Sequence, residues 1–123
     1  MPKSTINFAT VRKIGLEFTG VEESTAYGSP ALKVRGKLMA CVPTHRSAEP
    51  GSLAVCVHFA DREALLAEAP DIYYVTDHYV GYPSVLVRLS RVTPDLLRDL
   101  LGMAYKFVSR SRPARRRKPG AEE

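Results

Sequence analysis

Apolar residues recur at three- and four-residue steps near both ends of the chain, which predicts a helix in each place. The first helix can be capped by Ser4 or Thr5 and ended by Gly20. Its apolar positions are Phe8, Val11, Ile14 and Phe18. The last helix begins at residues 93–95, where a hydroxyl cap, a proline and an acid follow one another. A shorter helix, capped by its first residue, is expected over residues 61–68.

Between these helices, apolar runs predict strands. Residues 31–42 indicate a hairpin that turns at Gly36, and residues 53–59 are apolar on both faces, as in a central strand. Residues 84–90 predict another strand, and part of the tyrosine-rich segment 71–83 is expected to form a fifth. We therefore expect one α+β domain with an antiparallel sheet and the order α-β(3)-α-β(2)-α.

The length of 123 residues fits a single domain. The net charge of +5 is unevenly divided, because residues 109–123 hold six cations and two anions, or +4 of the total. Residues 1–108 are therefore expected to fold as a nearly neutral domain. Residues 109–123, which have almost no apolar side chains, are expected to form a disordered basic tail.

Cys41 and Cys56 both sit in apolar surroundings, which is typical of buried, reduced thiols in a reducing compartment. The first eight residues contain no apolar run, so we expect no secretory signal. The apolar stretches are far shorter than the ~20 residues of a membrane span. These features favour a soluble, cytoplasmic protein without a membrane partner.

A metal site could be imagined from Cys56 and His58, two positions apart on one strand, together with Cys41 and His78. Structural zinc sites usually have paired ligands at short spacing, whereas these thiols are single. Packing is the better interpretation, so we expect no metal and no cofactor. The eight glycines are scattered and form no phosphate-binding loop.

Catalysis by a nucleophile needs a base and an orienting group beside it. Asp77, His78 and Ser84 supply the residue types, but no nucleophile elbow or oxyanion-forming turn accompanies them. His78 is more simply explained as a cap or hydrogen-bonding group within the tyrosine-rich segment. We therefore expect no enzyme activity.

Protein surfaces that bind nucleic acid often combine cations with aromatic rings, because the cations contact phosphates while the rings stack on bases. The candidate nucleic-acid-binding residues are Lys33, Arg35, Lys37, Tyr79, Tyr82, Arg88, Arg91, Arg115, Arg116, Arg117 and Lys118. Simpler interpretations remain open for each group. The strand cations can be a solvated sheet face, the tyrosines can be core, and the tail can be a solubilising end.

Motifs in a fixed order and spacing resemble the MmcQ/YjbR family. They comprise residues 20–23, 27–28, 30, 33–34, 36–37, 77–79, 81–83 and 85–89, followed by the leucine-rich last helix. The resemblance covers roughly residues 5–108. It implies the same α-β(3)-α-β(2)-α layout and a bacterial protein of a family often described as DNA-binding.

These observations together predict a non-enzymatic protein that binds nucleic acid with little sequence preference. A protein-interaction module is an alternative, because the layout also resembles that of type III secretion chaperones. A small-ligand pocket lined by Tyr27, His78, Tyr79 and Tyr82 is a third. DNA or another protein is the expected partner, and the oligomeric state stays open. One contiguous patch of the strand cations would favour nucleic acid, and dispersal of these cations across faces would favour the interaction module.

Overall fold

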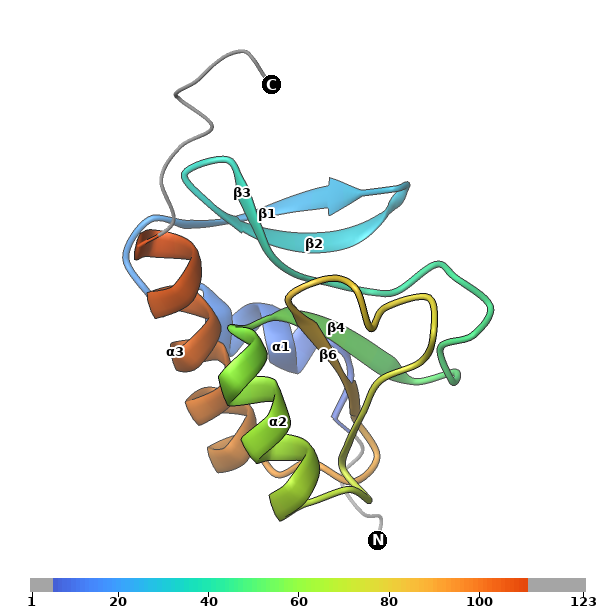
Figure 1. Ribbon diagram of the computed structural model, residues 1–123. Helices are drawn as coiled ribbons and strands as arrows, with labels where there is room; N and C mark the ends of the chain where they lie inside the picture. The colour runs from blue at the N-terminus through green and yellow to red at the C-terminus, as the bar shows by residue number, and fades with distance from the viewer. Residues whose placement is uncertain (1–5, 111–123) are drawn as a thin grey trace, which may run out of the picture.

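The computed structural model describes residues 6–110, which form three helices and one six-stranded antiparallel sheet (Figure 1). The elements are α1 (Phe8–Gly15), β1 (Val21–Ala26), β2 (Ser29–Val34), β3 (Lys37–Cys41), β4 (Ser52–Cys56), α2 (Phe59–Glu68), β5 (Tyr73–Tyr74), β6 (Ser84–Arg88) and α3 (Pro94–Arg110). The strand order across the sheet is β1-β2-β3-β4-β6-β5, so β4 is an interior strand, as its apolar sequence predicts. The predicted antiparallel α+β domain is confirmed.

The predicted element order had one strand too few, because β1 was not expected. Only Val21 is buried in this strand, and the next four residues are polar. β1 lies at the edge of the sheet and pairs on one side with β2. An edge strand needs neither two apolar faces nor strict alternation, which explains why the pattern of residues gave no signal.

The helix ends also differ from the prediction. α1 begins later than expected, because the Asn7 side chain accepts the backbone N–H of Thr10 at 3.3 Å. α2 is capped by His58, whose Nδ1 accepts the N–H of Ala60 at 3.1 Å, while Asp61 lies in the first turn. The predicted cap of α3 is confirmed, since Thr93 Oγ1 accepts the N–H of residue 96 at 3.1 Å.

α3 continues through Arg110, two residues into the predicted tail. The remainder of that tail, including Arg115, Arg116, Arg117 and Lys118, lies outside the described residues. Within residues 6–110, no helix is both long enough and apolar enough to cross a bilayer.

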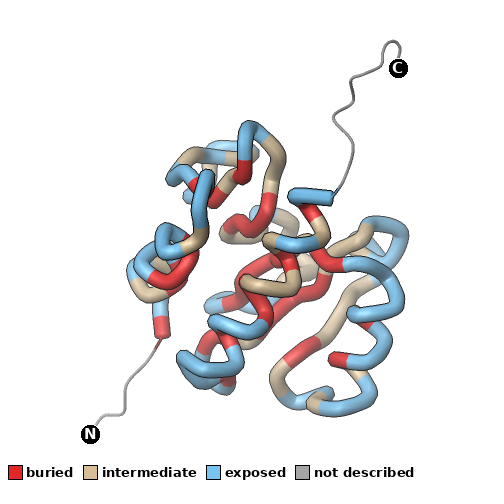
Figure 2. The backbone as a smooth tube through the Cα atoms, turned by 90° about the vertical axis from the view of Figure 1, so that its left-hand side faces the viewer, coloured by how far each residue is buried: buried red, intermediate tan, exposed pale blue. Residues whose placement is uncertain are grey.

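All three helices pack against the same face of the sheet and enclose the main core. Figure 2 shows the buried segments gathered between the elements, while the outer turns of the helices and the loop tips are exposed. The fully buried large side chains include Val11, Leu32, Met39, Leu53, Val55, Leu97, Leu100 and Leu101. The amphipathic pattern of α3 thus supplies much of the core, as predicted.

The opposite face, which we call the helix-free face, carries a second and smaller apolar cluster. Its buried residues are Ala31, Cys41, Ala54 and Leu86, which follow one another across β2, β3, β4 and β6. Two loops, residues 42–51 and 75–83, accompany this cluster (Figure 1, at the right). These loops give the helix-free face its cover.

Two tight turns join the first three strands. Tyr27 and Gly28 connect β1 to β2 with φ angles of 55° and 79°, and Arg35 and Gly36 connect β2 to β3 with φ angles of 51° and 85°. Two successive left-handed residues are the signature of a type I′ hairpin turn. The two turns therefore have the same geometry and lie at opposite ends of β2.

Candidate functional site

A pocket of about 630 Å³ lies on the helix-free face, and we call it the sheet-face pocket. Strand residues contribute small or medium side chains, namely Leu38, Cys41, Ala54, Cys56 and Ser84. The two loops and the β1–β2 turn contribute rings, namely Tyr27, His45, His78, Tyr79 and Tyr82. Its volume falls in the range of small-molecule sites, which is roughly 300–1,000 Å³.

Cys41 and Cys56 face this pocket from neighbouring strands. Both are free thiols, and Cys41 is buried while Cys56 is half-buried. Burial raises the pKa of Cys41, and burial together with the neighbouring Cys41 raises the pKa of Cys56 to about 11. Both thiols are therefore protonated at neutral pH and behave as small apolar side chains.

The two loops meet through a pair of histidines. The rings of His45 and His78 lie 3.6 Å apart, centroid to centroid, and are 7° from parallel. Tyr79 stands edge-on to both rings, at 6.2 and 4.8 Å. The Ser47 hydroxyl adds a bond between the loops, since its Oγ lies 2.8 Å from Oγ1 of Thr76. The pocket wall is therefore a joint product of both loops.

His45 is held in its neutral form. Its Nδ1 accepts the backbone N–H of Ser47 at 3.1 Å, which requires an unprotonated nitrogen. Desolvation lowers the pKa of His45, and the nearby His78 and Arg46 lower it further. His45 therefore adds no charge to the pocket wall at pH 7.

Arg62 of α2 holds the loop of residues 75–83 through bonds to its backbone. It is 5% exposed, and its guanidinium donates to the carbonyl oxygens of Tyr82 at 3.0 Å, Ser84 at 3.3 Å and Val80 at 3.1 Å. The same group lies over the ring of Phe59, 4.9 Å from its centroid. A rigid guanidinium fork suits such a set of carbonyl acceptors. Arg62 thus positions the loop segment that carries Tyr82.

Arg88 fixes the first loop in a similar way. Its Nε and Nη2 donate to the two carboxylate oxygens of Glu49 at 2.9 Å each, and its Nη1 donates to the carbonyl oxygens of Pro70 and Asp71. The guanidinium also lies 4.4 Å from the ring centroid of Tyr74. This pairing lowers the pKa of Glu49. Arg88 was a candidate nucleic-acid contact, and the structure places it in this internal network.

The other predicted strand cations fall into two groups. Lys33 is on the helix-free face, opposite Glu22 of β1 in the strand register, and Arg35 and Lys37 are at the β2–β3 turn. Arg88 is the last residue of β6, which is separated from β2 by β3 and β4, and Arg91 follows in the turn before α3. The register therefore separates the candidate cations instead of gathering them in one patch.

The predicted tyrosines do come together. Tyr79 is half-buried against the helix-free cluster, while Tyr82 is 60% exposed. With Tyr27 and His78, they are the four residues that the sequence placed in a pocket, and all four line the sheet-face pocket. His45 and Arg62 were missed, because neither stands in a motif and their partners are distant in sequence or are backbone carbonyls.

Of the four imagined metal ligands, Cys41, Cys56 and His78 line the sheet-face pocket, whereas His58 lies elsewhere. His58 caps α2 and stands edge-on to Phe107, with ring centroids 6.1 Å apart. His78 is stacked on His45. Within the described part of the chain, no three His, Cys, Asp or Glu side chains are placed to share a metal ion.

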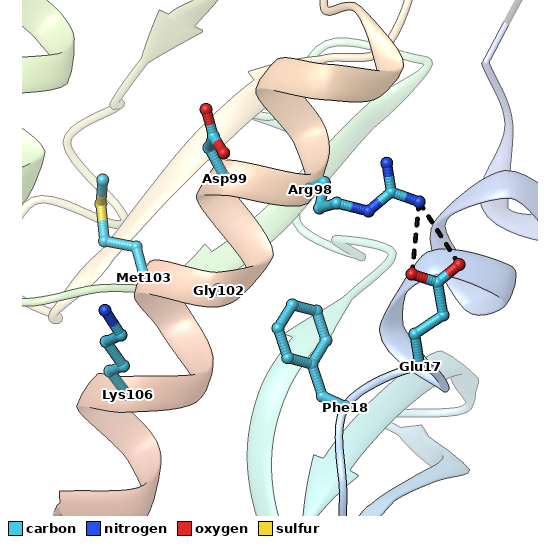
Figure 3. Close-up of a pocket in the computed structure, with 7 residues that line it drawn as sticks. All are labelled: Glu17, Phe18, Arg98, Asp99, Gly102, Met103 and Lys106. Atoms are coloured by element: carbon cyan, nitrogen blue, oxygen red, sulfur yellow. Dashed lines mark hydrogen bonds and ion pairs between the residues drawn. The ribbon is translucent and has the colours of Figure 1, made fainter.

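A second hollow, of about 530 Å³, lies between α3 and the segment after α1 (Figure 3). Arg98 and Glu17 form an ion pair across one side of it at 3.2 Å, and the Phe18 ring approaches Gly102. Asp99, Met103 and Lys106 line the α3 side. Its charged groups are the exposed Arg98–Glu17 pair and Asp99 and Lys106 of α3. Phe18 is the one aromatic ring among the described residues of its lining, so it lacks the converging rings of the sheet-face pocket.

Comparison with known proteins places the chain in context. The family model described as YjbR matches residues 16–107. Uncharacterized proteins of Mycobacterium bovis and of two strains of Mycobacterium tuberculosis are 43% identical over 42 residues, which is 34% of this chain and 33% of each relative. The crystal structure of a Deinococcus radiodurans protein with a DUF419 domain matches with a TM-score of 0.69 and 20% identity, over 90% of this chain and 84% of that one. At that identity the likeness concerns the fold.

Proposed function

The chain belongs to the YjbR family, and we propose that it is a cytoplasmic, non-enzymatic binding domain that holds a small ligand in the sheet-face pocket. The observation that carries the proposal is the way the pocket is built. Three segments distant in sequence contribute its rings, and two arginines, Arg62 and Arg88, each fix one of the loops. Preorganised walls reduce the entropic cost of binding.

The chemistry of the pocket supports binding without catalysis. The thiols of Cys41 and Cys56 have raised pKa values and are poor nucleophiles at neutral pH. The Ser47 hydroxyl lies 2.8 Å from His45 Nδ1, but the Ser47 backbone N–H donates to the same nitrogen, and Ser47 does not line the pocket. This contact is better explained as a bond that shapes the loop of residues 42–51 than as a nucleophile–base pair.

A two-dimensional amide NMR screen against a library of neutral and charged fragments tests the proposal. We expect binders to shift the amides of residues 42–46 and 78–84. Ala54→Phe, which fills the pocket from β4, should abolish these shifts, and Arg98→Met in the second hollow should leave them unchanged. Tyr82→Ala provides a variant at an exposed position that should fold normally. A screen in which no fragment shifts these amides would refute the proposal.

Nucleic acid remains the second candidate, and one observation favours it. Tyr27 and Tyr82 present exposed rings at the pocket, 84% and 60% accessible, and exposed rings can stack on single-stranded bases. Lys33 lies on β2, which follows Tyr27, and Arg35 and Lys37 lie at the opposite end of that strand, where they offer charge for phosphates. The basic residues 109–123 would add affinity without sequence preference.

Binding to one single-stranded and one duplex oligonucleotide across a salt series separates these contributions. Removing residues 109–123 should flatten the duplex slope of log affinity against log salt by roughly 4–5, since each neutralised phosphate contributes about −0.9. If the truncated chain keeps both affinity and slope, the hairpin cations bind the phosphates. If the full chain shows no salt-dependent binding, the nucleic-acid candidate is wrong.

A further inference from the structure

Among the described residues, the lining of the sheet-face pocket contains no Asp, Glu, Lys or Arg. The nearby guanidinium groups of Arg62 and Arg88 are engaged with carbonyl oxygens and with Glu49. His45 is neutral because its Nδ1 accepts a backbone N–H. A charged group entering this pocket would lose its water without gaining a carboxylate, ammonium or guanidinium partner, which is strongly unfavourable. The enclosed part of a ligand must therefore be neutral.

The shape of the lining also restricts the ligand. Five of the lining side chains are rings, from Tyr27, His45, His78, Tyr79 and Tyr82, and they surround small strand residues such as Ala54 and Ser84. Aromatic rings attract one another in offset-stacked or edge-to-face pairs, beyond the effect of buried area. Hydroxyl groups of Thr44 and Ser84 add hydrogen-bonding capacity. A flat ring with a polar substituent matches this combination.

Tyr27 provides an independent observation. It takes the first position of a type I′ turn, with φ of 55°, where asparagine or glycine is favoured and a bulky residue is an outlier. Burial does not compensate for this conformation, because the side chain is 84% exposed. Strained backbone is often found at functional sites, and of the two non-glycine residues with a positive φ in the described part of the chain, Tyr27 is the one that lines the pocket. The ring of Tyr27 lines the pocket, which supplies such a function.

We propose that the sheet-face pocket is selective for an uncharged, flat aromatic ring, and that Tyr27 is a ligand-contacting residue. This inference rests on the proposed function and names the class of its ligand. It predicts discrimination by charge and by flatness, two properties that can be varied separately on one carbon framework.

Three probes isolate these properties: 2-naphthol, 2-naphthoate and decahydro-2-naphthol. The first is neutral and flat at pH 7.5, the second is flat but anionic, and the third is neutral but not flat. Amide shifts titrated with each probe give its affinity for the full chain. We expect 2-naphthol to bind in the pocket, and the other two to bind weaker by about tenfold or more.

The second turn offers a matched control for Tyr27. Arg35 has nearly the same φ in a turn of the same type, but it does not line the pocket. Tyr27→Asn and Arg35→Asn should both raise the unfolding midpoint slightly, since asparagine tolerates a left-handed φ. Tyr27→Asn should weaken 2-naphthol by about tenfold, which is the size of one aromatic contact. Arg35→Asn should leave its affinity unchanged.

The outcomes distinguish this inference from the proposed function. Equal binding of 2-naphthoate or of decahydro-2-naphthol in the pocket overturns the ligand class but leaves a ligand pocket in place. Unchanged affinity in Tyr27→Asn overturns the role of Tyr27. No binding of any of the three probes overturns the inference as a whole, whereas the proposed function fails when the fragment library also gives no shift at the pocket amides.

Discussion

Replacing Arg62 with methionine should destabilise the domain strongly, although α2 lies at the surface. Methionine keeps much of the apolar stem but removes three bonds from a cation to the carbonyl oxygens of Val80, Tyr82 and Ser84. Hydrogen bonds to a charged group contribute about 1.5–3 kcal/mol each. Part of this is recovered, because Nε of Arg62 is buried with no hydrogen bond in the described residues and its desolvation cost disappears. We expect a net loss of about 2–4 kcal/mol.

Urea unfolding of the variant and of a matched control measures this loss. Arg98→Met is the control, because Arg98 pairs with Glu17 while the two side chains remain 47% and 51% exposed, and such surface pairs contribute about 0–1 kcal/mol. Hydrogen exchange should also become faster at the amides of Tyr82 and Ser84. If Arg62→Met loses no more stability than the control, the guanidinium does not hold this loop, and the preorganised pocket wall loses its main support.

Three further predictions concern the pocket lining. Because the pKa of His45 is lowered, the stability linked to its neutral form is present above pH ~6.5 and declines as the pH falls towards the lowered pKa. The urea midpoints at pH 7 and pH 5 should therefore differ less in His45→Gln than in the unmodified protein. An equal difference in the two proteins would contradict the neutral assignment of His45. Cys41 and Cys56 should react slowly with a thiol reagent at pH 8 in the native protein and rapidly in urea, because burial raises both pKa values, that of Cys56 to about 11. Tyr79→Ala should cost roughly 2 kcal/mol of stability, since the ring is half-buried. Tyr82→Ala, at 60% exposure, should leave the urea midpoint nearly unchanged, and equal losses in the two variants would be inconsistent with their placement.

The periodicity of apolar residues predicted the helices and strands that pack against the core. It failed for a strand that has little contact with the core. α3 and β4 were recognised because their apolar residues must meet the core at regular steps. β1 was missed because its residues 22–25 are polar and its place in the sheet is fixed by backbone hydrogen bonds to β2. The cap of α1 was placed too early because Ser4, Thr5 and Asn7 are all good caps, and sequence alone does not rank them.

The aromatic residues of the candidate site were predictable from the sequence, but the interactions that hold its loops in place were not. The density of tyrosines between residues 71 and 83 marked the segment, and Tyr79 and Tyr82 do line the pocket. The role of Arg62 rests on bonds to main-chain oxygens, which have no sequence signature. The separation of Lys33 from Arg88 follows from strand order and register, which alternation along each strand does not reveal.

The unequal packing of the two sheet faces explains how a pocket can exist beside a complete core. On the helix side, large residues such as Leu53 and Val87 belong to the main core and are fully buried. On the helix-free face, the neighbouring positions hold Ala54, Cys56 and Ser84, which leave the pocket volume unfilled. Each further methylene buried there would add about 0.8 kcal/mol of stability. Side chains that leave this stabilisation unused are expected where the space itself serves function, since binding sites commonly trade stability for activity.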